Sequence, residues 1–161
     1  MTTTSRPAAR RRTSWGSLLM GIGFGGFVDG IVLHQILQWH HMLSHREPAT
    51  TLAGLELNSV ADGFFHAVTW LFVLLGSFVL VRESRRQESP DLATYAGMLL
   101  IGWGAFNLVE GTVNHHLLRI HHVRDDLGGP ASWDVGFLAL SVLLLVLGWA
   151  VHRRGGAGHE V

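Results

Sequence analysis

Four apolar stretches, separated by short polar segments, make up most of the chain. They cover residues 15–42, 60–81, 92–123 and 133–151. A helix needs about 20 predominantly apolar residues to cross the hydrocarbon core of a bilayer, which is roughly 30 Å thick, and each stretch is of about this length or longer. The pattern therefore predicts an all-α integral membrane protein, a bundle of four transmembrane helices that lies in a lipid bilayer.

The segments between the apolar stretches are polar, and each contains a proline; they cover residues 44–58, 82–91 and 124–132. We expect residues 1–14 to form a disordered basic cytoplasmic tail, residues 15–152 the four-helix membrane domain and residues 153–161 a flexible C-terminal tail. Because the first apolar stretch is too long for the core of a signal peptide, it is predicted to stay as an uncleaved anchor.

The composition agrees with a membrane protein. Only 15% of the residues are charged, compared with about a quarter in soluble domains. The 12 basic residues, all arginine, balance 12 acidic residues, so nucleic acid is not an expected partner. The absence of cysteine excludes disulfides and thiolate metal ligands. The unusual feature is the presence of 11 histidines, since imidazole is the commonest metal ligand in proteins.

The arginines predict the orientation in the membrane. Short loops rich in arginine stay cytoplasmic, and nine of the 12 arginines lie in the two tails and in the 82–91 segment. We therefore predict a multi-pass protein of the inner cell membrane with both termini in the cytoplasm. Nine of the 11 histidines lie toward the opposite membrane face, which places the candidate chemistry at the outer side.

The sequence repeats itself at an offset of 81 residues. Both copies contain an acid followed by glycine, then a histidine, then a histidine pair; the matching residues are Asp29 and Glu110, His34 and His115, His40–His41 and His121–His122. The second and fourth apolar stretches match at an offset of 72, which aligns Asp62 with Asp134. We therefore predict a duplicated helical hairpin, a parallel repeat with a pseudo-two-fold axis along the membrane normal.

Ionisable residues within or beside the spans are candidates for a metal site. A charged side chain at the centre of a membrane helix costs roughly 2.5 to 3.5 kcal/mol on insertion scales, so Asp29 and Glu110 need a partner. Histidine with carboxylate and no thiolate suits copper, iron or zinc. The candidate metal ligands are His34, His66, His115, Asp29, Asp62, Glu110, His40, His41, His116 and His121. The alternatives are a polar pair that holds helices together and, for His41, His45 and His122, imidazoles solvated among the headgroups.

Helical geometry predicts how deep each candidate lies. On continuous helices the acids lie about 16 Å below the histidine pairs, so one metal ion does not reach all of them. One arrangement is a deep site with an outer collar of histidine pairs, and its ligands are Asp29, His34, Asp62, His66, Glu110 and His115. The other is two metals stacked along the axis. Asp62 fits a helix N-cap or a ligand equally, and Asp134 is interpreted as an N-cap.

A glycine-rich segment, residues 21–26, matches the dinucleotide-binding pattern G-x-G-x-x-G. That signature requires a strand before it and a soluble βαβ unit around it, whereas this copy lies within a predicted membrane helix. We interpret Gly21, Gly25, Gly26 and Gly30 as small residues that let two helix backbones approach each other.

Four segments carry a family resemblance: 27–41 (FVDGIVLHQILQWHH), 107–111 (NLVEG), 114–116 (NHH) and 121–124 (HHVR). With them, the chain resembles an uncharacterised bacterial family of small predicted membrane proteins, a domain of unknown function, over nearly its whole length apart from the tails. The resemblance implies a four-helix membrane protein and brings no established activity or cofactor. It also implies an association with assembly factors of copper-containing cytochrome oxidases, which favours copper and makes respiratory oxidase assembly proteins candidate partners.

Three functions stay open on these observations. The first is a transition-metal site open to the outer membrane face, which serves metal handling, with copper favoured, or oxidase-associated assembly. The alternative is a membrane di-metal oxidoreductase that acts on an apolar substrate entering from the lipid. The third and least favoured is haem b held by facing histidines such as His34 and His115. No catalytic residue is assigned, enzymatic activity stays open, and a homo-oligomer is compatible with the sequence.

Overall fold

The computed structural model describes residues 14–86, 88 and 90–155. Within these residues all regular secondary structure is helical. The elements in chain order are α1 (Trp15–Phe27), η1 (Val28–Ile36), α2 (Leu52–Arg85), α3 (Leu92–Glu110), η2 (Gly111–Leu117), η3 (Asp125–Leu127) and α4 (Ala131–Gly155). The π-helical segments η1 and η2 continue α1 and α3 directly. The four long helices that result are each long and apolar enough to cross a membrane, as the sequence predicts.

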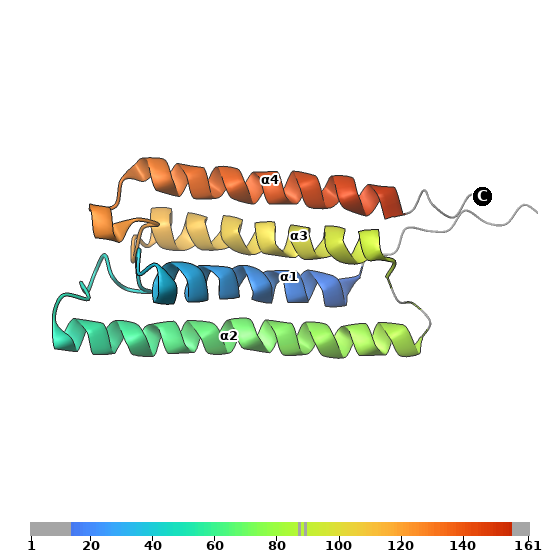
Figure 1. Cartoon of the computed structure of the whole chain (residues 1–161), viewed down its shortest axis with the longest axis horizontal. Coiled ribbons are helices and arrows are strands. Elements are labelled where there is room, and N and C mark those ends of the chain that lie inside the picture. Colours follow the sequence, from blue (N-terminus) through green and yellow to red (C-terminus); the bar gives the residue numbers. More distant parts are fainter. Residues whose placement is uncertain (1–13, 87, 89, 156–161) are drawn as a thin grey trace, which may run out of the picture.

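The four helices lie side by side in a bundle (Figure 1). α1 packs against α2 and α3, and α3 also packs against α4, so α1 and α3 form the middle of the bundle. The start of α1, the end of α4 and the segment between α2 and α3 lie at one end, which we call the terminal end (Figure 1). Residues 37–51 and 118–130 lie at the opposite end, which we call the loop end (Figure 1).

Glycine sets the distance between the two middle helices. At Gly21 a Cβ atom would collide with the backbone carbonyl of Leu99, and at Gly102 with the backbone carbonyl of Leu18. The backbones of α1 and α3 are therefore in direct contact, a packing that small residues permit in membrane helices. The interpretation as close helix packing is confirmed for Gly21, whereas Gly26 and Gly30 pack against side chains of Thr69 and His66.

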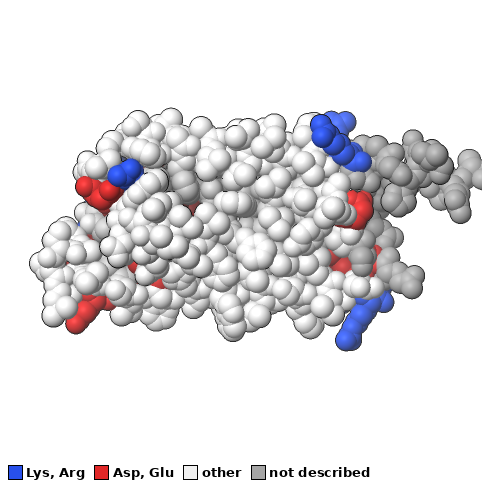
Figure 2. Space-filling view, viewed as in Figure 1, with Lys and Arg blue, Asp and Glu red and all other residues white. Residues whose placement is uncertain are grey.

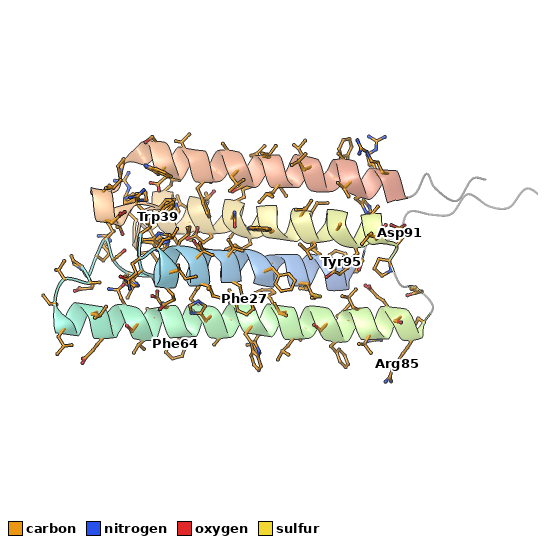
Figure 3. All side chains as sticks on the ribbon, viewed as in Figure 1. Phe27, Trp39, Phe64, Arg85, Asp91 and Tyr95 are labelled. Atoms are coloured by element: carbon orange, nitrogen blue, oxygen red, sulfur yellow. The ribbon has the colours of Figure 1, made fainter. Side chains whose placement is uncertain are left out.

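Polar side chains fill the interior, and apolar side chains cover the outside. His34, Asn58 and Thr69 are among the largest fully buried side chains, whereas Phe64 is 72% exposed. In Figure 3, Phe64 points from α2 away from the bundle. Figure 2 shows the charged groups near the two ends, with an uncharged surface between them. This distribution fits a bundle whose sides face lipid, where no hydrophobic effect draws apolar groups inside.

Arginine side chains gather at the terminal end of the bundle, where Figure 2 shows them in blue on either side. They belong to the last turns of α2 and α4, and Arg85 is labelled there in Figure 3. These arginines are among those from which the sequence predicts the orientation of the protein in the membrane. The cytoplasmic location of this end stays a prediction.

The first and third helical segments end earlier than the hydropathy predicts. They were expected to continue to residues 42 and 123, but they end at Ile36 and Leu117. Gln38 and Arg119 then adopt left-handed backbone conformations, with φ values of 50° and 49°. The prediction of longer helices is wrong because these turns send residues 37–51 and 118–130 back over the loop end.

The second helix begins earlier than predicted, at Leu52 instead of residue 60. The Thr51 hydroxyl is its N-cap, because it accepts the Gly54 N–H at 3.1 Å. Asp62 therefore lies well inside α2, and its interpretation as an N-cap is wrong.

The first helix begins at the predicted residue, Trp15, and the last helix ends slightly later than predicted. Ser14, assigned to the N-terminal tail, caps α1 by accepting the Ser17 N–H. α4 continues to Gly155, past the predicted end of the membrane domain at residue 152. The remainder of the two predicted tails, residues 1–13 and 156–161, lies outside the described residues.

Candidate metal centre

Six ionisable side chains meet inside the loop end of the bundle, and we call them the central cluster. They are two acids and four histidines: Asp29, His34, His40, Glu110, His115 and His121. Each of them is buried, with at most 6% of its surface exposed. They come from η1, the end of α3, η2 and the two loops that fold back. Figure 3 shows side chains crowded at this end, near the labelled Trp39.

In the first half of the cluster, Asp29 faces two histidines. The Nε2 atom of His34 lies 3.4 Å from Asp29 Oδ2, and the Nε2 atom of His40 lies 3.7 Å from Asp29 Oδ1. His40 reaches the acid because the left-handed turn at Gln38 returns the chain toward the helix. The expected separation of about 16 Å between the acid and the histidine pair is wrong, since it assumed a continuous helix.

The second half repeats this arrangement around Glu110. The Nε2 atoms of His115 and His121 lie 3.4 Å and 2.8 Å from Glu110 Oε1. The left-handed turn at Arg119 returns His121 to the helix end. Matching residues of the two halves are again 81 positions apart.

The two halves are in contact through their histidine rings. The rings of His40 and His121 stack with their centres 4.6 Å apart and their planes at 11°. Metal-binding atoms within 4.8 Å of one another form two groups in the described chain, His34 with His40 and His121, and Glu110 with His115 and His121. Because His121 belongs to both groups, these five side chains form one continuous set. Asp29 adjoins the set through its contacts with His34 and His40.

Two of the histidines also hold the folded-back loops together. His40 donates its Nδ1 proton to the carbonyl of Val123, and His121 donates its Nδ1 proton to the carbonyl of Met42, both at 3.0 Å. Each histidine thus bonds to the other loop. A carbonyl oxygen only accepts, so Nδ1 carries the proton in both rings. Nε2 of His40 then keeps its lone pair for a metal, whereas Nε2 of His121 lies 2.8 Å from Glu110 Oε1.

Asp62 and Asp134 support the other two histidines from outside. His34 donates Nδ1–H to Asp62 at 2.9 Å, and the Nδ1 atom of His115 lies 3.3 Å from Asp134. A carboxylate behind a histidine is typical of metal sites, because it fixes the orientation and tautomer of the ring. The interpretation of Asp134 as an N-cap is wrong, since its oxygens face His115 and the Val123 N–H.

His41 and His122 belong to this outer layer and not to the centre. The Nδ1 atom of His41 lies 2.8 Å from Asp62, and the Nδ1 atom of His122 lies 2.6 Å from Asp134. Each histidine pair of the sequence is therefore divided. Its first member points to the centre, and its second member holds the outer carboxylate.

Two predicted ligands lie apart from the central cluster. His66 packs from α2 against the backbone of η1 at Gly30, and His116 is exposed. Of the ten predicted ligands, the structure brings six together at the centre and places Asp62 and His41 in the outer layer.

Several donor atoms of the cluster have no hydrogen-bond partner among the described residues. They are Asp29 Oδ2, His34 Nε2, His40 Nε2, Glu110 Oε2 and both ring nitrogens of His115. Buried polar atoms are normally paired, because leaving one unpaired costs about 1 to 3 kcal/mol. A cation in either group of donors would be a partner for several of these atoms, so the residues present fit a metal.

The surrounding protein shifts the pKa values of the two loop histidines, His40 and His121, in opposite directions. Burial lowers the pKa of His40 well below its usual value. Burial also disfavours the charged form of His121, but the hydrogen bond and the charge of Glu110 prevail and raise the pKa of this ring. His40 would therefore offer a neutral ring to a metal, whereas a metal would have to displace a proton from His121.

The comparison with protein families agrees with this architecture. A family model described as "Predicted membrane protein (DUF2243)" matches residues 16–155. The chain belongs to the DUF2243 family. The match includes every residue of the central cluster, and it confirms the family of predicted membrane proteins that the motifs indicate. No curated protein and no solved structure matches this DUF2243 chain.

Proposed function

We propose that this DUF2243 protein is an integral membrane metalloprotein that holds a transition-metal centre in the central cluster. The observation that carries the proposal is the convergence of four histidines and two carboxylates, five of which have a buried donor atom without a hydrogen-bond partner among the described residues. Acceptors outside the centre bind Nδ1 of His34, His40 and His121, and Nε2 of His34 and His40 has no partner among the described residues. Partners of this kind behind the rings are usual in a metal site.

The donor set suits copper, iron or zinc. Imidazole binds all three, carboxylate adds a harder oxygen ligand, and thiolate is absent from the chain. We propose copper first, because the family resemblance brings an association with assembly factors of copper-containing oxidases. In that role the protein serves copper handling, with oxidase assembly proteins as partners.

The burial of the cluster favours a resident ion over an ion in transit. Each donor residue is at most 6% exposed, and the folded-back loops bond to each other through His40 and His121. This cover does not support the expectation of a site open to the outer face. We propose a tightly held ion that exchanges only when the two loops separate.

A membrane oxidoreductase is the second candidate function, and two cavities between the helices favour it. One of about 390 Å³ reaches Asp29, and one of about 400 Å³ reaches Glu110. Each connects a carboxylate of the central cluster with an apolar lining. An apolar substrate from the bilayer would reach the metal by such a route.

Haem b is the least supported cofactor. The rings of His40 and His121 stack directly on each other, and His34 and His115 lie against these same two rings. A porphyrin needs a flat space between two facing histidines, and the packed imidazoles occupy that space.

Metal analysis of purified variants tests the proposal. The protein is expressed with copper, iron and zinc supplied, dialysed and analysed for metal per chain, with folding checked by circular dichroism. Wild type should retain metal, and His40→Ala and His121→Ala should lose it, because each removes a central ligand. His116→Ala removes an exposed histidine and is the matched control. Equal metal retention in all four folded proteins would contradict the proposal.

A further inference from the structure

The cavity that reaches Asp29 has an aromatic lining. It lies between α1 with η1, α3 and α4, measures about 390 Å³, and is lined by Trp39, Trp103, Trp133 and Phe137 among others. This volume falls within the range of roughly 300 to 1,000 Å³ that is typical of small-molecule sites.

The cavity opens on the lipid-facing side of the bundle. Val28, Trp133 and Leu140 line it and are 38%, 41% and 45% exposed. All three lie in segments long and apolar enough to span a membrane. A molecule dissolved in the bilayer can therefore enter without passing the folded-back loops.

Asn107 places a hydrogen-bond acceptor inside this apolar space. It lines the cavity and is 3% exposed, and no partner for its Oδ1 atom is found in the part of the chain that the structure describes. The neighbouring lining residue Asp29 has an unpartnered Oδ2 atom as well. Both atoms accept hydrogen bonds, so a ligand that satisfies them has to donate.

The second cavity, which reaches Glu110, has a less buried asparagine. Its asparagine, Asn114, donates Nδ2–H to Glu110 at 3.3 Å. The residue 81 positions before Asn107 is Gly26, which packs tightly against Thr69. Of these two cavities, the first therefore has the more deeply buried neutral acceptor, Asn107 Oδ1.

We propose that the first cavity binds a lipid-soluble phenol or hydroquinone whose hydroxyl group donates to Asn107 Oδ1. An aromatic ring packs favourably against Trp and Phe side chains, and a buried acceptor selects a hydroxyl over a group that cannot donate. Because Asp29 lines the same cavity, the hydroxyl lies beside the central cluster. The idea that such a molecule is the substrate of the membrane oxidoreductase rests on that proposed function. Binding of the molecule to the cavity needs no metal.

Two probes that differ in one hydrogen-bond donor test the proposal: 4-octylphenol and its methyl ether, 4-octylanisole. Each is titrated into the full-length protein in lipid nanodiscs, and binding is read from tryptophan fluorescence, since three of the six tryptophans line the cavity. Empty nanodiscs correct for partition into lipid. The phenol should bind roughly tenfold more tightly, as expected for one buried hydrogen bond.

Three variants show whether the preference arises at the proposed site. Asn107→Leu should remove the preference for the phenol. Gly136→Leu should weaken both probes, because Gly136 lines the cavity and a side chain there enters open space without a clash. Gly63→Leu makes the same change on α2, also into open space, and should leave binding unchanged.

Equal binding of the two probes to wild type, or a preference that survives in Asn107→Leu, would overturn the proposal. Titrations with metal-free and metal-loaded protein separate this result from the metal proposal. A phenol preference in a protein that retains no metal supports the binding site and refutes the oxidoreductase. Retained metal without a phenol preference refutes the binding site alone.

Discussion

Replacing Asp62 by asparagine tests how the outer carboxylates prepare the metal centre. Asp62 accepts hydrogen bonds from His34 Nδ1 at 2.9 Å, and from His41 Nδ1 and the Met42 N–H at 2.8 Å each. Asparagine has nearly the same size, but one of its two terminal atoms donates, so it cannot accept from both histidines. If the His34 ring moves its proton to Nε2, it loses the lone pair that binds the metal.

The expected loss of metal affinity in Asp62→Asn follows from the position of Asp62. Loss of a partner behind a metal-binding histidine typically costs 10 to 100-fold in metal affinity. Asp62 is 1% exposed, and it also holds the folded-back loop through the Met42 N–H. We therefore expect a loss of about 100-fold, or about 2.8 kcal/mol. The site should still fill at high metal concentration, because all six central donors are unchanged.

The assay is a competition titration of the purified protein against a chelator of known affinity, with folding checked by circular dichroism. Asp126→Asn is the matched control, since Asp126 lies in the other loop, is exposed and pairs with Arg124. It should change the metal affinity less than twofold, as is usual for an exposed ion pair. If Asp62→Asn and Asp126→Asn bind metal equally well, Asp62 does not prepare the centre.

The orientation of the bundle, its helix packing and the pH dependence of metal binding lead to further predictions. A reporter fused after Val161 should be active only in the cytoplasm, as the arginines predict; periplasmic activity would reverse the orientation. Gly21→Val should destabilise the protein by about 1 to 3 kcal/mol, because α3 leaves no room for a side chain there. The control Gly63→Val should not destabilise it, because Gly63 faces open space. Equal thermal stabilities of the two variants would refute this packing. Because Glu110 raises the pKa of His121, a metal has to displace a proton from this ring, and metal affinity should rise with pH. The rise should be about tenfold per pH unit below that pKa and should stop once the ring is neutral. A metal affinity that does not change between about pH 6 and 8 would show that no proton is displaced.

The membrane helices could be predicted from hydropathy, because a span requires a length of apolar residues and little else. Their ends were harder to predict. Residues 52–59 contain Glu56 and Asn58, which hydropathy assigns to a loop. In the structure Asn58 is buried in α2 and accepts the Leu43 N–H, while its amide donates to the Glu47 carbonyl. These contacts come from the folded-back loop, which local hydropathy does not describe.

The folded-back loops could not be predicted from the residues that make the turns. Gln38 and Arg119 adopt positive φ values, which are uncommon for residues other than glycine, so their identity does not mark a turn. Without the turns, His40 and His121 are placed far above the acids. All six residues of the central cluster were nevertheless among the candidates, because the spacing of acids and histidines recurs in both halves.

The repeated contacts bear on the predicted duplication. The hydrogen bond from His40 to the Val123 carbonyl has its counterpart, 81 positions on, in the bond from His121 to the Met42 carbonyl. The left-handed turns at Gln38 and Arg119 are separated by the same offset. We propose that the bundle arose from a duplicated hairpin, with the central cluster on the axis between the copies.

The metal content of the purified wild-type protein tests the central claim most directly. The protein is supplied separately with copper, iron and zinc, dialysed against a weak chelator and analysed for each element. The account predicts that a stoichiometric amount of metal, copper first, is retained and that the double variant His40→Ala/His121→Ala, folded by circular dichroism, retains none. A folded wild type that retains only traces of all three metals would contradict the assignment of the central cluster as a metal centre.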